Sequence, residues 1–169
     1  MTPDLRDALR HCLRGRVCFL GLGNPDLADD GFGVRLAEAL DGITGVTVIA
    51  AGVTPERHIE RIAREEFDNV VFLDAVDAGA PPGSVVLLGS GDLVGRFPQI
   101  STHKFSLGTL ASLIRMRSRA AVWLLGVQPA SLRGTGLSST LDASRRALQV
   151  LICDALRADL AGATGSSPR

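Results

Sequence analysis

Residues 16–40 read RVCFLGLGNPDLADDGFGVRLAEAL, and this stretch decides the fold class. Its first seven residues form an apolar run rich in β-formers and interrupted by Gly21, which predicts a buried strand. From Asp30 to Leu40 the apolar residues return at helical spacing, so a helix is expected directly after the strand. A buried strand followed closely by a helix is the repeating unit of an α/β protein.

The same alternation continues along the rest of the chain. Further strands are expected at 46–51, 69–76, 84–88 and 120–127, and further helices at 4–14, 54–66, 104–116 and 139–160. Too few residues separate 69–76 from 84–88 for a parallel crossover, so the fourth strand should run antiparallel. The sequence therefore predicts a three-layer α/β/α sandwich around a five-stranded, mostly parallel sheet with strand four antiparallel.

We divide the chain into an N-terminal extension helix at 1–15, a single α/β domain at 16–161 and a flexible tail at 162–169. The sequence has 18 basic and 18 acidic side chains, which gives no electrostatic footprint for nucleic acid. No apolar run approaches the roughly 20 residues of a membrane span. Three cysteines without a close pair favour reduced thiols and a cytoplasmic protein.

Three side chains stand out as candidates for chemistry. Asp30 opens the helix after the first strand, and Asp74 lies near the end of an otherwise apolar strand, where a carboxylate is costly without a partner. His103 precedes the helix expected at 104–116. If all three converge at the carboxyl ends of the strands, two carboxylates and one imidazole suit a borderline divalent cation. Each also has a structural interpretation, and on the position of Asp29 and Asp30 at a helix start alone we favour stabilisation of the helix dipole by both.

Other chemistries are less well supported by the sequence. The glycine-rich turn at 21–25 suggests a dinucleotide site, but Asp26 occupies the third glycine position of that motif. A serine nucleophile would need a strand–turn–helix elbow, whereas Gly89-Ser90-Gly91 is expected in a loop. Cys18 and Cys153 fall inside an expected strand and helix, so we interpret both as packing thiols.

Several segments together resemble one known family. Residues 19–33 are similar to the opening G-x-G-N-x-x-x-x-D-[DE]-x-x-G of the [NiFe]-hydrogenase maturation endopeptidases. Residues 71–77, 101–103 and 126–129 resemble that family's apolar strand ending in D-A, its (S/T)-x-H segment and its late G-(I/V)-x-P turn. The matches occur in order and span roughly residues 16–142.

The resemblance implies an endopeptidase that removes a C-terminal extension from the [NiFe]-hydrogenase large-subunit precursor after nickel insertion. Nickel, supplied by the precursor, would serve as the recognition element, and the family's metal contacts and catalytic residues would map onto Asp30, Asp74 and His103. The enzyme is expected to act as a monomer.

Two alternatives remain open beside this interpretation. One is a chaperone that binds nickel and the precursor without cutting. The other is an esterase similar to peptidyl-tRNA hydrolase. Residues 21–25 also resemble the G-L-G-N-P opening of that family. That family's catalytic histidine has no counterpart here, because no histidine follows before His58.

Overall fold

A five-stranded sheet forms the centre of the molecule, of which the computed structural model describes residues 4–96 and 105–164. Its strands are β1 (Val17–Leu22), β2 (Val46–Gly52), β3 (Asn69–Ala75), β4 (Val85–Gly89) and β5 (Ala121–Val127). They lie in the order β2-β1-β3-β5-β4, and every pair is parallel except β4 with β5. The predicted topology is thus confirmed, including the antiparallel fourth strand.

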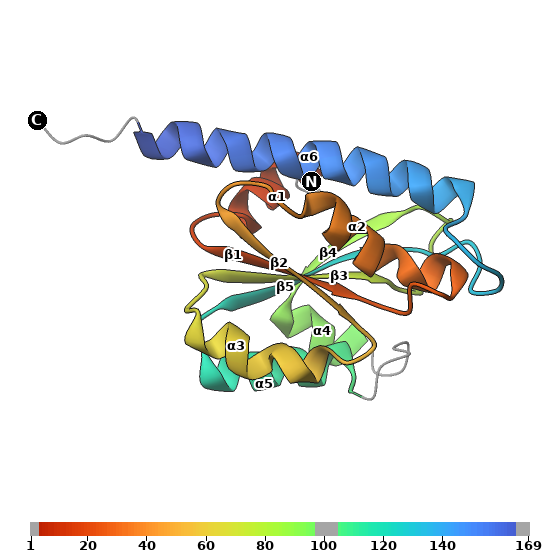
Figure 1. Ribbon diagram of the computed structural model, residues 1–169, viewed down its shortest axis with the longest axis horizontal. Coiled ribbons are helices and arrows are strands. Elements are labelled where there is room, and N and C mark those ends of the chain that lie inside the picture. The colour runs from red at the N-terminus through yellow and green to blue at the C-terminus, as the bar shows by residue number, and fades with distance from the viewer. Residues whose placement is uncertain (1–3, 97–104, 165–169) are drawn as a thin grey trace, which may run out of the picture.

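Helices cover both faces of this sheet, so the three-layer α/β/α arrangement is also confirmed (Figure 1). One layer contains α1 (Leu5–Cys12), α2 (Phe32–Leu40) and α6 (Ser139–Thr164). The opposite layer contains α3 (Ile59–Arg64), α4 (Ser90–Arg96) and α5 (Leu107–Arg117). Within the described ranges, no helix combines the length and the hydropathy that crossing a bilayer would require.

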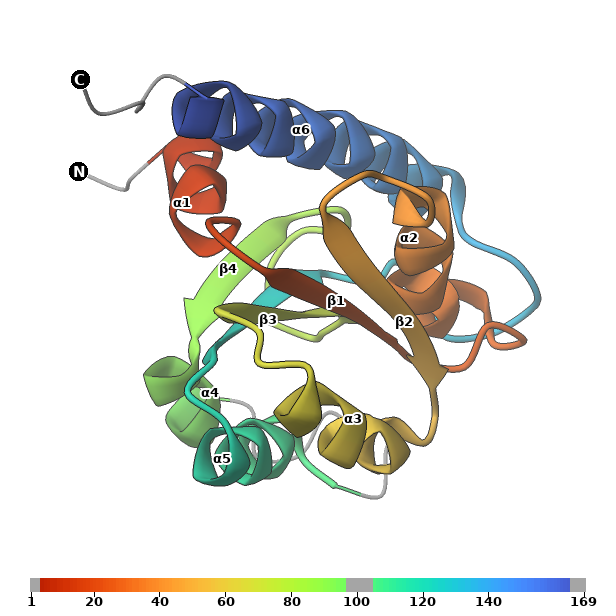
Figure 2. The ribbon, with the colours of Figure 1, turned by 60° about the vertical axis from the view of Figure 1, so that its left-hand side comes forward.

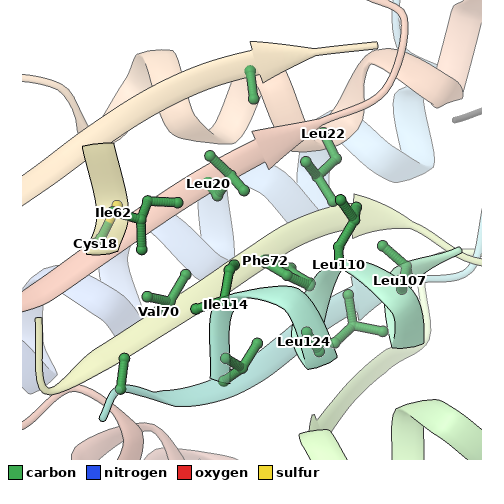
Figure 3. Packing of buried hydrophobic residues seen from close by; sticks show 14 of the residues in the cluster. Cys18, Leu20, Leu22, Ile62, Val70, Phe72, Leu107, Leu110, Ile114 and Leu124 are labelled. Atoms are coloured by element: carbon green, nitrogen blue, oxygen red, sulfur yellow. The ribbon is translucent and has the colours of Figure 1, made fainter. Parts of the chain in front are cut away.

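Two hydrophobic cores result, one on each side of the sheet. Successive strand residues point to opposite faces, so Cys18, Leu20 and Leu22 enter one core while Val17 and Phe19 enter the other. Figure 3 shows the first core, where Phe72 and Leu124 pack against helix α5. All residues of β1 and β3 are buried, as expected for strands covered on both faces.

The structure differs from the sequence prediction at several element ends. Short 3-10 helices, η1 (Ala28–Gly31) and η2 (Pro55–His58), precede α2 and α3. Helix α4 occupies the place of a predicted loop, so the loop assignment for Gly89-Ser90-Gly91 is wrong. Helix α6 continues to Thr164, beyond the predicted end at 160 and into the segment predicted as a flexible tail. The N-terminal helix forms as expected, with the Asp4 carboxylate accepting from the Arg6 N–H at 3.2 Å.

Candidate active site

Two of the three candidate residues, Asp30 and Asp74, lie at the same edge of the sheet. Strands β1 and β3 are neighbours and run in parallel, so their carboxyl ends lie side by side. Asp30 belongs to η1, which follows β1, and Asp74 is the sixth of the seven residues of β3. Both side chains are buried, with 5% and 2% of their surface exposed. The edge that carries them is where ligand sites form in open α/β sheets.

Glycines bring η1 and α2 close to this edge. A Cβ on Gly33 would lie 1.9 Å from the carbonyl oxygen of Leu73, the residue before Asp74. Gly23 has φ +107°, and a Cβ there would lie 1.8 Å from the Asp30 carbonyl oxygen. The glycines in the turn therefore permit close backbone packing, which holds Asp30 beside the end of β3.

The turn also uses its own N–H groups to bind a carboxylate of the chain. The backbone N–H of Asn24 donates to Asp30 Oδ2 at 2.8 Å. That N–H would be one of the donors to pyrophosphate in a dinucleotide site. Because it is already bonded to a buried carboxylate, the turn is poorly suited to hold a phosphate.

Asp74 faces a position where the neighbouring strand has no side chain. It is paired in register with Gly126 of β5, and Gly126 is itself paired with Val86 of β4. A Cβ on Gly126 would lie 2.5 Å from a methyl group of Val76. The packing of Val76 around Gly126 therefore leaves no room for a side chain on β5 at the position paired with Asp74.

The third candidate, His103, lies outside the described residues. Among residues 4–96 and 105–164 there is no group of three metal-ligating side chains. Asp30 and Asp74 would supply two oxygen donors of the kind that divalent cations accept, and a third contact would have to come from elsewhere. The chemistry of this donor pair fits a divalent cation.

Asp29 has a role that the sequence did not indicate. Its side chain is fully buried and accepts four hydrogen bonds from the segment between β5 and α6. Oδ2 accepts from the N–H groups of Ala130 at 2.8 Å and Ser131 at 2.9 Å and from Ser138 Oγ at 3.0 Å, and Oδ1 accepts from the Ser138 N–H at 2.7 Å. Burial alone would raise the pKa of the Asp29 carboxyl, but these hydrogen bonds outweigh it and hold the pKa below its usual value. Asp29 thus anchors this segment to the turn that carries Asp30.

The thiols have the environment of packing residues. Burial raises the pKa of both Cys12 and Cys18 to about 12, which leaves very little thiolate at neutral pH. Cys153 is half-buried on α6, and all three cysteines are free. Neither buried thiol lies at the carboxyl edge of the sheet, since Cys12 is on α1 and Cys18 is the second residue of β1.

Fold and site together define an α/β protein with a pair of buried carboxylates at the carboxyl edge of its sheet. The family model for hydrogenase maturation proteases matches residues 34–158. The hydrogenase 3 maturation protease of Escherichia coli strain K12 is 30% identical over 112 residues, which cover 65% of this chain and 70% of that protein. The chain therefore belongs to the hydrogenase maturation protease family.

Other relatives extend this comparison. The hydrogenase expression/formation protein HupD of Thiocapsa roseopersicina is 33% identical over 129 residues, covering 71% of this chain and 57% of the relative. The chain thus matches less than two thirds of the length of that relative.

Solved structures agree in fold over most of the chain. The [NiFe] hydrogenase maturation protease HycI of Thermococcus kodakarensis KOD1 has a TM-score of 0.79 at 29% identity, covering 89% of this chain and 99% of its own. The hydrogenase maturating endopeptidase HybD of E. coli has a TM-score of 0.72 at 28% identity, covering 85% and 93%.

Proposed function

We propose that this protein is an endopeptidase that removes the C-terminal extension of a [NiFe]-hydrogenase large-subunit precursor after nickel insertion. The observation that carries the proposal is the pair of buried carboxylates, Asp30 and Asp74, at the carboxyl edge of the sheet in a member of this family. Nickel belongs to the substrate in this proposal, because it arrives bound to the precursor. Other divalent cations with similar ligand preferences could bind the same residues.

The residues of the chain have defined roles in this scheme. Asp30 and Asp74, with His103 as the third contact, bind the nickel of the precursor and so position the scissile bond. The nickel of the precursor would supply Lewis-acid chemistry at the scissile carbonyl, and one of the two aspartates holds a water molecule. That aspartate accepts a proton as the water oxygen attacks the carbonyl carbon. The C–N bond then breaks, and the proton passes to the departing nitrogen.

The protein is expected to act as a monomer in the cytoplasm. Three free thiols support a reducing compartment. The alternative that the protein binds the loaded precursor without cutting it would use the same carboxylates, so only the product distinguishes a chaperone from a protease.

The direct test is incubation of the protein with nickel-loaded and nickel-free precursor, followed by intact-mass measurement of both. Loss of a C-terminal peptide from the loaded form alone is expected. Asp30→Asn and Asp74→Asn should each lower the cleavage rate by about 100-fold or more, since each removes a charged contact to the metal. His103→Ala should weaken nickel binding in a calorimetric titration.

Asp41→Asn is the matched control, because Asp41 is an exposed aspartate at the other end of α2 whose side chain accepts from the neighbouring Gly42 N–H. It should cleave at the wild-type rate. Wild-type cleavage by Asp30→Asn or Asp74→Asn would refute the assigned site. Retention of the loaded precursor without any loss of mass would favour the chaperone.

A further inference from the structure

Exposed apolar side chains gather around the candidate site. Among the described residues, five large hydrophobic side chains are exposed, and three of them lie in loops at the carboxyl edge of the sheet. Leu27 is 42% exposed in the loop after β1, Val53 is 46% exposed after β2, and Leu132 is 48% exposed after β5. We call these three residues the apolar rim. Single exposed apolar residues are ordinary, and these three differ from the others in lying on loops at one edge that backbone hydrogen bonds join.

The other two exposed apolar residues lie elsewhere. Met116 is on the last turn of α5, which leads into the start of β5 and therefore lies at the amino edge of the parallel strands. Val150 is in the middle of α6. Both are more exposed than any residue of the apolar rim, so they serve as internal controls.

Backbone hydrogen bonds join the three loops that carry the apolar rim. Gly23 N–H donates to the carbonyl of Gly52, the residue before Val53, at 3.1 Å. Ala28 N–H, next to Leu27, donates to the carbonyl of Gly134 at 3.1 Å. Figure 2 shows the loops after β1 and β5 side by side. The rim residues are therefore carried on loops with fixed relative positions.

Asp29 fixes the most exposed of these loops. Residues 130–136 are all exposed, yet the segment is anchored at Ala130, Ser131 and Ser138 by the buried Asp29 carboxylate. Asp29 N–H also donates to the Ser131 carbonyl at 3.2 Å. A loop held in one conformation before binding avoids the entropy cost of ordering it on contact. The anchor is adjacent in sequence to Asp30, so the loop is positioned relative to the candidate site.

We propose that the apolar rim is the docking surface for the folded protein part of the large-subunit precursor, which is held there while its nickel meets Asp30 and Asp74. This inference rests on the proposed function, because it takes the precursor as the partner. Apolar side chains on prearranged loops suit contact with a folded protein surface, and these loops lie at the edge of the sheet that carries Asp30 and Asp74.

The test compares precursor cleavage by two rim variants and two controls. The rim variants are the double variant Leu27→Ser/Leu132→Ser and the single variant Val53→Ser, and the controls are Met116→Ser and Val150→Ser. The rim variants should raise KM about 10-fold while kcat stays within about twofold, because docking is lost and the bound metal site is intact. The controls should match wild type in both constants. Circular dichroism and thermal melts should be unchanged for all variants, since every substituted side chain is exposed.

The outcomes separate this inference from the proposed function. Cleavage by wild type with an unchanged KM in the rim variants would overturn the docking surface alone. If wild type binds the loaded precursor without cutting it, the protease proposal fails. The Kd from biolayer interferometry then tests the docking surface: weaker binding by the rim variants, with wild-type binding by the controls, supports it. If wild type neither cleaves nor binds the precursor, both proposals are overturned. If wild type forms a dimer that the rim variants abolish, the surface is assigned to self-association.

Discussion

Asp29 and Asp30 are adjacent carboxylates with different environments. Asp30 accepts a hydrogen bond from the turn that precedes it, through Asn24 N–H, and lies beside the end of β3. Within the described part of the chain, the Asp29 carboxylate accepts four hydrogen bonds, all from residues more than one hundred positions further along. Asp30 is thus bonded within its own turn at the site, while Asp29 holds a loop that is distant in sequence.

Replacing Asp29 by Asn should destabilise the fold more than an ordinary surface substitution. The carboxylate has two acceptor oxygens, and the amide would turn an N–H₂ group toward one of the donors of Ser138 or the Ala130–Ser131 pair. A buried donor without an acceptor costs about 2 kcal/mol. Urea unfolding should show the free energy of unfolding lowered by this amount, with an unchanged m-value.

Ser138→Ala and Asp41→Asn complete this experiment. Asp41→Asn should change the free energy of unfolding by less than about 0.5 kcal/mol, because that side chain is exposed. Asp29→Asn and Ser138→Ala should be non-additive, since Ser138 Oγ donates to Asp29 at 3.0 Å. Additive effects of the two changes would show that the hydroxyl and the carboxylate do not interact in solution.

The placement of Asp30 and Asp74 at one edge of the sheet could be predicted for a local reason. Each carboxylate stands at the end of an apolar strand or at the start of a helix, and the strand pattern alone places both at one edge. No local pattern could assign Asp29, whose partners lie 101 to 109 residues away. The placement of His103 stays a prediction.

At the level of elements, the approach of α2 to the sheet depends on Gly33. A Cβ at this position would lie 1.9 Å from the Leu73 carbonyl oxygen and 2.4 Å from that of Leu22. Both are backbone atoms of strands that pair with each other, so they have little freedom to move away. Helix α2 therefore sits as close to β1 and β3 as a residue without a side chain allows.

Gly33→Ala should lower the free energy of unfolding by about 3 kcal/mol or more, because α2 must shift away from both strands. Gly91→Ala is the matched control, since Gly91 is in a helix and no atom of residues 4–96 or 105–164 lies within 4 Å of its added Cβ. It should be neutral or stabilising by up to about 1 kcal/mol. Equal effects of the two substitutions in denaturant unfolding would mean that the contact with Leu73 is not retained.

Apolar periodicity predicted the strands with a strong apolar pattern. It missed helix α4 and did not separate the 3-10 turns η1 and η2 from the helices that follow them. β1 and β3 are mostly apolar and buried throughout, and their assignment is confirmed. Helix α4 begins with Ser-Gly-Asp, which is typical of a turn, so its helical state was not apparent from the sequence. The 3-10 turns η1 and η2 share the residue pattern of the helices that they precede, and periodicity does not distinguish the two.

At the level of the whole molecule, one sheet is shared by two cores on opposite faces. Cys12 is buried in the core beneath α1, α2 and α6, and Cys18 in the core beneath α3 and α5. Removal of either helix layer would expose one face of β1 and β3, whose residues are buried throughout. The two layers should therefore unfold together, and the two thiols report on one layer each.

A thiol-reactive reagent in a urea titration tests this cooperativity. In the native protein at pH 8, a pKa of about 12 leaves about one thiolate in 10,000 at Cys12 and Cys18, so only Cys153 should react rapidly. Cys153→Ser/Cys12→Ala leaves Cys18 as the probe, and Cys153→Ser/Cys18→Ala leaves Cys12. In each variant, thiol exposure should have the same midpoint as the fluorescence of Trp123, the sole tryptophan, on β5. A thiol that becomes reactive at lower urea than the Trp123 transition would instead show that its helix layer separates from the sheet first.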